Sequence, residues 1–109
     1  RISQKHLGVT LQPGMILSNE PGLYRTGEYG IRIENLVVVT TAGDEGFGSF
    51  LRLDTLSLYP FERTLIEPQL LTTDERTWVN EYHLRVREEL SPLLRGKPVE
   101  RLQEMTSPL

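Results

Sequence analysis

The sequence predicts an α+β fold, in which short antiparallel strands come first and helices follow. Two observations lead to this prediction. Residues 31–41 are rich in β-branched side chains, which favour strands. From Thr73 onward, apolar residues recur at about every fourth position, which is the period of a helix. Because strands precede helices instead of alternating with them, the long helix is expected to lie across or beside the sheet.

Three strands are predicted in the first half of the chain. Residues 15–20 form a short strand-like run and residues 31–41 form the clearest strand, while the glycine-containing residues 23–30 between them are read as a loop. These two strands should therefore pair antiparallel. Residues 42–48 predict a turn, and the alternating apolar pattern of residues 50–59 predicts the third strand.

The second half of the chain is predicted to be mainly helical. Thr72 or Thr73 can cap a helix whose first turn is acidic, which suits the helix dipole. This helix should run for roughly six turns to a cap at Gly96. A shorter helix is expected over residues 99–105, and residues 61–71 read as mixed and partly extended. The apolar stripe of the long helix comprises Trp78, Val79, Tyr82, His83, Val86, Leu90 and Leu94.

Composition excludes several classes of protein. The 109 residues carry a net charge of −3, with scattered basic side chains, so neither nucleic acid nor an anionic membrane is an expected partner. No apolar run approaches the roughly 18 residues of a membrane helix. The absence of cysteine excludes disulfides, a thiolate zinc site and a cysteine nucleophile. The chain starts at Arg1, and we expect it to be one part of a longer, cytoplasmic polypeptide.

Two glutamates stand out as candidate site residues. Glu20 precedes Pro21, which holds the backbone extended and gives the side chain a fixed direction, and Gly22 permits a tight departure of the chain. Glu34 lies in a strand with apolar residues on both faces, which is expected to be covered on both sides. A buried carboxylate needs a cationic partner. Either Arg32 on the same face or a hard metal ion such as Mn²⁺ could serve.

Spacing alone leaves two interpretations of this pair open. In the first, Glu34 forms a structural salt bridge with Arg32, and Glu20 is a surface residue at the edge of a loop. In the second, both glutamates bind a metal ion. Two glutamates at such a separation occur by chance in many proteins, so the spacing does not decide between the interpretations.

A longer motif resembles a known family. Residues 13–24, Pro-Gly-Met-Ile-Leu-Ser-Asn-Glu-Pro-Gly-Leu-Tyr, followed by residues 30–35, Gly-Ile-Arg-Ile-Glu-Asn, resemble the pita-bread metallopeptidases of family M24. That family includes methionine aminopeptidase, prolidase and aminopeptidase P, which is an Xaa-Pro aminopeptidase. Residues 53–60 and 78–83 are similar to the C-terminal extension of the larger aminopeptidases P.

The resemblance implies a fold and a reaction. Residues 1–46 would be the C-terminal portion of a pita-bread catalytic domain, and residues 47–109 would be the extension typical of the large aminopeptidases P. The reaction would be hydrolysis of the bond between an N-terminal residue and a following proline. Two divalent metal ions would assist it, with Mn²⁺ expected and Zn²⁺ or Co²⁺ as alternatives. The substrate would be a peptide with proline at its second position.

Family members bind their metals with two aspartates, one histidine and two glutamates. By resemblance, Glu20 would bind one metal and handle a proton, Glu34 would bridge both metals, and Arg32 would orient the carboxylates. The aspartates and the histidine are expected upstream. This chain alone should therefore be inactive and hold no metal tightly. His6 reads as a surface histidine and His83 as a structural hydrogen-bonding residue.

Two further interpretations stay open. A pita-bread protein that has lost its metal would be a binding or dimerisation module instead, and the upstream residues would decide this. Residues 47–109 could be structural, closing the catalytic domain or forming a homodimer contact. The missing ligands imply that the upstream half of the same polypeptide is the chain's main partner.

Overall fold

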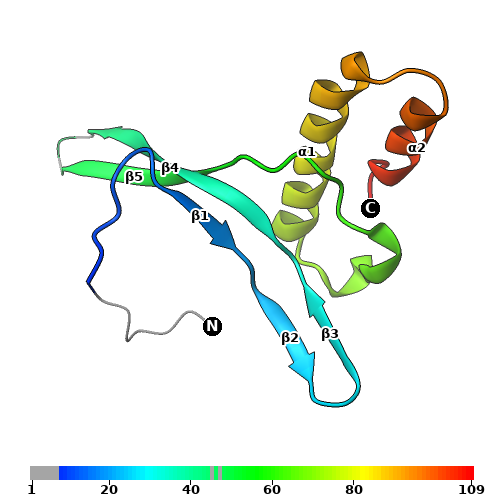
Figure 1. Ribbon diagram of the computed structural model, residues 1–109, viewed down its shortest axis with the longest axis horizontal. Helices are drawn as coiled ribbons and strands as arrows, with labels where there is room; N and C mark the ends of the chain where they lie inside the picture. Colours follow the sequence, from blue (N-terminus) through cyan, green and yellow to red (C-terminus); the bar gives the residue numbers. More distant parts are fainter. Residues whose placement is uncertain (1–7, 45, 47) are drawn as a thin grey trace. The chain divides into compact units, whose positions relative to one another are not determined.

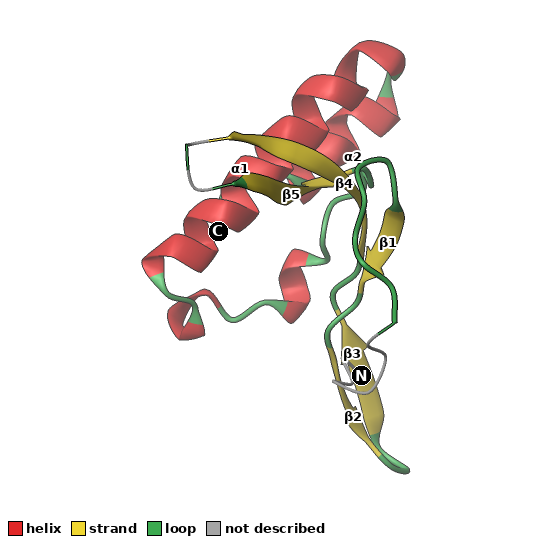
Figure 2. Cartoon of the chain, turned by 90° about the vertical axis from the view of Figure 1, so that its left-hand side faces the viewer, coloured by secondary structure: helices red, strands yellow, loops and turns green. Residues whose placement is uncertain are grey.

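The computed structural model describes residues 8–44, 46 and 48–109, which form two compact units. The first unit, Arg1–Ser57, contains strands β1 to β5, and the second, Leu58–Leu109, contains the helices (Figures 1 and 2). Strands therefore precede helices, and the predicted α+β class is confirmed. His6 and the start of the chain lie outside the described residues.

A three-stranded antiparallel sheet forms the body of the first unit. Its central strand is β4, which pairs with β1 on one side and β5 on the other. Val37 and Val39 of β4 are buried, whereas Leu36, which points to the opposite face, is 47% exposed. The predicted antiparallel pairing of the first two strands is confirmed. The strands are β1 (Ile16–Asn19), β4 (Asn35–Asp44) and β5 (Ser49–Thr55).

The segment that was predicted to be a loop, residues 23–30, belongs to a β-hairpin. Strand β2 (Gly22–Arg25) pairs antiparallel with β3 (Tyr29–Arg32), and the hairpin continues from β1 and β4 (Figure 1). Gly27 in the connection has a φ of 75°, which glycine adopts without strain. The glycine signal thus marked only the tip of the hairpin, and the residues beside it are strand.

The third strand is shorter than predicted. β5 ends at Thr55, but hydrogen bonds to β4 continue for two residues: Leu56 N donates to Leu36 O at 2.8 Å, and Leu36 N donates to Ser57 Oγ at 2.7 Å. The turn predicted over residues 42–48 is narrower, because β4 extends to Asp44. Residues 45 and 47 lie outside the described residues.

Two helices that lie side by side form the second unit (Figures 1 and 2). They are α1 (Thr73–Leu90) and α2 (Lys97–Met105). Thr72 begins α1 with a capping box: Glu75 N donates to Thr72 Oγ1 at 3.2 Å, and Thr72 N donates to Glu75 Oε2 at 2.9 Å. Of the two predicted caps, Thr72 is therefore correct. The short C-terminal helix is also confirmed and begins two residues earlier than expected.

The core of the second unit lies between α1 and α2. Tyr82 and Val86 of α1 pack with Leu102 of α2, and the partly buried side chains around them are Leu58, Phe61, Leu90 and Leu94. Most of the predicted stripe is therefore core. Trp78 is the exception, because it remains 49% exposed while its ring stacks on Tyr82 and Phe61.

Two predictions about the end of the long helix are wrong. Gly96 is not the end of that helix but the residue before α2, with a φ of 66°. The roughly six turns are also too many, because α1 ends at Leu90 and passes into a 3-10 turn, η3 (Ser91–Leu93). Pro92 has no N–H with which to continue the helical bonding.

The partly extended stretch predicted within residues 61–71 instead forms two 3-10 turns, η1 (Arg63–Leu65) and η2 (Pro68–Leu70). A glutamate caps each turn: Glu62 accepts from Thr64 N at 3.1 Å, and Glu67 accepts from Gln69 N at 3.2 Å. No helix in the described part of the chain combines the length and apolar character that crossing a membrane requires.

Candidate metal centre

Glu20 and Glu34 lie directly opposite each other at a break between two antiparallel ladders. The β1–β4 ladder ends one residue before this pair, and the β2–β3 ladder begins two residues after it. Both ladders follow the same register, so extending either one across the break aligns the two glutamates. The flanking aligned pairs are Asn19–Asn35 and Gly22–Arg32.

Pro21 accounts for the break. Ile33 N donates to Pro21 O at 3.1 Å, but Pro21 has no N–H to donate in return. This rung therefore keeps one of the two backbone bonds that such a pair normally exchanges. Because hydrogen-bonded and non-hydrogen-bonded pairs alternate, Glu20 and Glu34 form a non-hydrogen-bonded pair, in which opposite side chains are closer together.

Arg32 lies between the two carboxylates. Like charges on opposed residues repel, and the guanidinium contacts both: Arg32 Nη2 is 2.8 Å from Glu34 Oε2, and Nη1 is 3.6 Å from Glu20 Oε2. The charge of Glu34, a hydrogen bond with Tyr24 and, more weakly, the charge of Glu20 raise the pKa of Arg32. The structure thus brings together all three of the site residues that the sequence predicts.

Tyr24 completes this face of the hairpin. A Cβ atom added at Gly22 would lie 2.7 Å from the Tyr24 hydroxyl oxygen, and one added at Gly30 would lie 2.7 Å from Tyr24 Cδ1. The tyrosine ring therefore covers both glycines, and its side chain hydrogen-bonds to Arg32. Gly22 consequently makes room for a ring, in addition to the backbone role expected of it.

Sequence reasoning did not select Tyr24, although a signal was present. Residues 20, 22 and 24 of one strand and 30, 32 and 34 of the other project to a single face by strand alternation. Two of these six positions are glycine, opposite or beside one large aromatic residue. Such a combination indicates that the aromatic ring lies flat on the two-stranded hairpin, over the glycines.

The predicted burial of Glu34 is wrong. Glu34 lies between β3 and β4 and outside both, and its side chain is 39% exposed. The neighbouring apolar residues Ile31 and Ile33 are exposed as well. Desolvation therefore does not explain why this carboxylate needs a cation in the structure. Repulsion between the opposed carboxylates of Glu20 and Glu34 explains it instead.

The donor atoms fit part of a metal site. Carboxylate oxygens suit hard divalent cations such as Mn²⁺, and the two carboxylates converge on one cationic group. Within residues 8–44, 46 and 48–109, however, no cluster of three or more His, Cys, Asp or Glu side chains could hold a metal ion. The hollow on this face is lined by Ser18, Asn19, Glu20, Pro21, Gly22, Tyr24 and Arg32.

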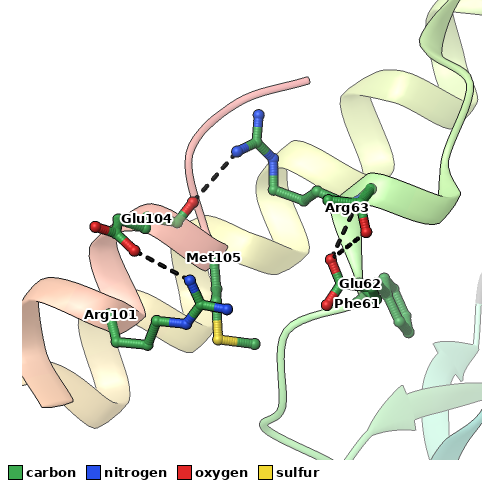
Figure 3. A pocket seen from close by; sticks show the side chains of 7 residues that line it. Phe61, Glu62, Arg63, Arg101, Glu104 and Met105 are labelled. Atoms are coloured by element: carbon green, nitrogen blue, oxygen red, sulfur yellow. Dashed lines mark hydrogen bonds and ion pairs between the residues drawn. The ribbon is translucent and has the colours of Figure 1, made fainter.

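Arginine side chains of the second unit join its elements, as in the hydrogen bonds from Arg63 to Pro108 O and from Arg87 to Thr106 O. The hollow in Figure 3 contains an Arg101–Glu104 ion pair of 3.1 Å, and Arg63 Nη1 donates to Glu104 O at 3.2 Å. His83 is fully buried and accepts a hydrogen bond from Phe61 N at 3.1 Å, which confirms its predicted structural role.

Comparisons with known proteins agree with the resemblance seen in the sequence. Residues 49–109 match a family model described as the C-terminal region of peptidase_M24, and residues 1–41 match the model for metallopeptidase family M24. The chain is 42% identical over 85 residues to Xaa-Pro aminopeptidase 1 of Dictyostelium discoideum, and 41% identical over 107 residues to a Coprinopsis cinerea protein named "Probable Xaa-Pro aminopeptidase P".

A solved structure is similar too. It is an X-prolyl aminopeptidase from Caenorhabditis elegans, described as a cytosolic enzyme with a di-nuclear active site. It matches 95% of this chain with a TM-score of 0.82 and 35% sequence identity. The match to the Dictyostelium protein covers 77% of this chain, and the match to the Coprinopsis protein covers 91%. The chain spans only a small part of these relatives: 18% of the C. elegans chain, 14% of the Dictyostelium protein and 17% of the Coprinopsis protein.

Proposed function

The chain belongs to metallopeptidase family M24, and on this premise we propose that it is part of a dinuclear-metal aminopeptidase that hydrolyses the N-terminal Xaa-Pro bond. The names of its relatives support this reaction, and the di-nuclear active site of the C. elegans enzyme supports a dinuclear centre. The substrate in this proposal is a peptide with proline at its second position.

One observation carries the proposal: Glu20 and Glu34 oppose each other on a non-hydrogen-bonded rung. Such a pair of anions is unfavourable unless a cation lies between them. Arg32 meets this need incompletely, since its contact to Glu20 is 3.6 Å against 2.8 Å to Glu34. A divalent ion would neutralise both carboxylates at once.

The proposed roles follow from these positions. Glu20 and Glu34 would hold metal, which when bound supplies Lewis acidity and lowers the pKa of a water molecule. Glu20 is also the proposed proton carrier during turnover, as the family resemblance implies. Arg32 would orient both carboxylates by hydrogen bonding, as groups behind metal ligands commonly do. Mn²⁺ is the proposed metal.

The 109-residue chain alone is proposed to be inactive. Its described residues supply two candidate carboxylates at this face, and two carboxylates bind a divalent ion only weakly. The further ligands would come from an upstream half of the same polypeptide, which is the proposed partner. Release of an N-terminal residue from an Xaa-Pro peptide by the purified chain with Mn²⁺ would contradict this point.

The decisive experiment measures metal content and Xaa-Pro hydrolysis in a polypeptide that joins this chain to its upstream half. Glu34→Gln removes one anion while keeping the shape of the side chain, and it should abolish stoichiometric metal and activity together. Glu28→Gln is the matched control, because Glu28 lies in the same hairpin and pairs with Arg25 at 3.7 Å. Unchanged metal content in Glu34→Gln would count decisively against the assignment.

A metal-free binding or dimerisation module is the second candidate. The observation that favours it is the Arg32 contact to both glutamates, which reduces their repulsion without metal. The two candidates predict different metal binding by the polypeptide that includes the upstream half. The binding module would bind no divalent ion, even at concentrations that saturate an M24 enzyme. Direct metal analysis after dialysis separates them.

Two subsidiary proposals concern the whole protein. Residues 47–109 would close the catalytic domain or form a homodimer contact, and size-exclusion chromatography over a wide concentration range tests the dimer. A monomer at every concentration would exclude it. The cytoplasm is the proposed location, supported by the description of the C. elegans relative as cytosolic. Fractionation of cells that produce the complete protein checks it.

A further inference from the structure

Two consecutive residues of α1, Tyr82 and His83, form hydrogen bonds to the backbone of residues 59–61, near the start of the helical unit. The Tyr82 hydroxyl donates to Tyr59 O at 2.8 Å and accepts from Tyr59 N at 3.3 Å. His83 Nε2 accepts from Phe61 N at 3.1 Å. Residues 59–61 are thus fastened to α1 by side chains that bind backbone atoms, and this segment has no strand or helix of its own.

The His83 contact requires a neutral imidazole. A nitrogen that accepts a hydrogen bond carries no proton, so the proton of neutral His83 is on Nδ1. The side chain is fully buried, and Nδ1 has no hydrogen-bond partner among the described residues. Bulk water therefore does not reach an imidazolium at this position, and the described part of the chain offers Nδ1 no acceptor.

The charged groups around His83 also oppose a second proton. Burial lowers the pKa of His83 first, and the positive charges of Arg63 from η1 and Arg87 from α1 lower it further. Both arginines are fixed, because Arg63 Nη1 donates to Glu104 O at 3.2 Å and Arg87 Nη2 donates to Thr106 O at 2.6 Å. The carboxylate of Glu104, on α2, is paired with Arg101. The carboxylate of Glu62 accepts from Thr64.

We propose that His83 is a proton-sensitive clasp, which holds residues 59–61 on α1 when the imidazole is neutral and releases them when it is protonated. A second proton on Nε2 would point at the Phe61 N–H and remove the acceptor. Phe61 stacks on Tyr82 at 4.7 Å and on Trp78 at 5.9 Å between ring centroids, so release would also disturb this aromatic cluster. No metal and no part of the candidate metal centre takes part.

The direction of the pH effect follows from the lowered pKa. The folded unit binds fewer protons than the unfolded chain between the lowered pKa and the ordinary histidine value near 6.5. The stability contributed by neutral His83 is therefore complete above the ordinary value. It is lost as the pH falls below that value toward the lowered pKa.

The clasp is testable in the 109-residue chain by NMR between about pH 8 and about pH 4.5, a range that spans histidine titration. We expect the hydrogen-exchange protection factor of the Phe61 amide to fall at least about fivefold as the pH is lowered, in a single titration step, because one hydrogen bond is lost. Trp78 is the single tryptophan, and its emission should change in the same step. The ring nitrogen shifts should show Nδ1–H and an unprotonated Nε2 at neutral pH.

Matched variants separate His83 from other titrations. His6→Gln removes the second of the two histidines and should leave the step unchanged. His83→Gln keeps an acceptor near the position of Nε2 but does not titrate, so the step should vanish. A step that persists in His83→Gln, or that depends on His6, would overturn the proposal. If His83→Gln does not fold, the unsubstituted chain still tests the proposal. A proton on Nε2 at neutral pH would overturn it, and so would hydrogen-exchange protection of the Phe61 amide that does not change as His83 titrates.

Discussion

Glu20 and Glu34 oppose each other across a ribbon whose next rung, at Pro21, keeps a single backbone hydrogen bond. The proline thus has two effects: it holds the residue before it extended, and it interrupts the ladder beside the acidic pair. The interruption leaves both carboxylates partly exposed and close to one guanidinium. Substitutions at Arg32 and at Gly30 test this arrangement in the chain by itself.

Arg32→Met should weaken the β2–β3 hairpin, because two opposed carboxylates would then face each other without the guanidinium. We expect backbone amides of the hairpin to exchange about twofold to fivefold faster at low salt, and the difference should shrink as salt screens the charges. Arg25→Met is the control, since Arg25 lies in the same hairpin but pairs with Glu28. Equal effects of the two variants at every salt concentration would show that Arg32 has no special electrostatic role.

Gly30→Ala should destabilise the hairpin through a steric clash, because the added Cβ would lie 2.7 Å from Cδ1 of Tyr24. Strand residues normally gain from alanine over glycine, so a loss would point to the ring. Gly8→Ala is the control, with nothing within 4 Å of the added atom. Combining Gly30→Ala with Tyr24→Ala gives a double-mutant cycle, and additive effects would disprove the contact.

Much of this architecture follows from local sequence patterns. Three of the predicted features depend on residues that are close in the sequence, so the sequence was enough to predict the strand and helix that they form. They are the β-branched run of residues 31–41, the apolar residues at every fourth position from Trp78, and the Thr72–Glu75 capping box. The order of strands and helices follows directly. The family resemblance rested on residues that the matching family models also cover.

The features that sequence reasoning missed depend on pairing between distant residues. Glycines in residues 23–30 suggested a loop, because only the cross-strand register shows that Gly22 and Gly30 lie under Tyr24. Burial of Glu34 was inferred from apolar neighbours, but every residue of β2 and β3 is exposed, so no other segment among the described residues covers this hairpin. The 3-10 turns after Phe61 arise from glutamate caps, which hydrophobic periodicity does not reveal.

Thr72→Ala should destabilise the helical unit by about 1 kcal/mol, because the side chain accepts a hydrogen bond from Glu75 N at the start of α1. Thr73→Ala is the matched control: it removes the neighbouring threonine, which is the first residue of the helix and not its cap. Urea unfolding monitored by helical circular dichroism measures both. A larger loss for Thr73→Ala would mean that α1 is capped one residue later than the structure shows.

Val86→Ala should cost the helical unit about 2 kcal/mol, because Val86 is fully buried in the cluster with Tyr82 and Leu102 and its truncation leaves a cavity. Val9→Ala removes the same atoms from a side chain that is 77% exposed, and it should change the free energy of unfolding by less than about 0.5 kcal/mol. Unfolding should be followed through the fluorescence of Trp78, the single tryptophan, which stacks on Tyr82 in this unit. A cost for Val86→Ala no greater than that of the control would show that α1 and α2 do not share a packed core in solution.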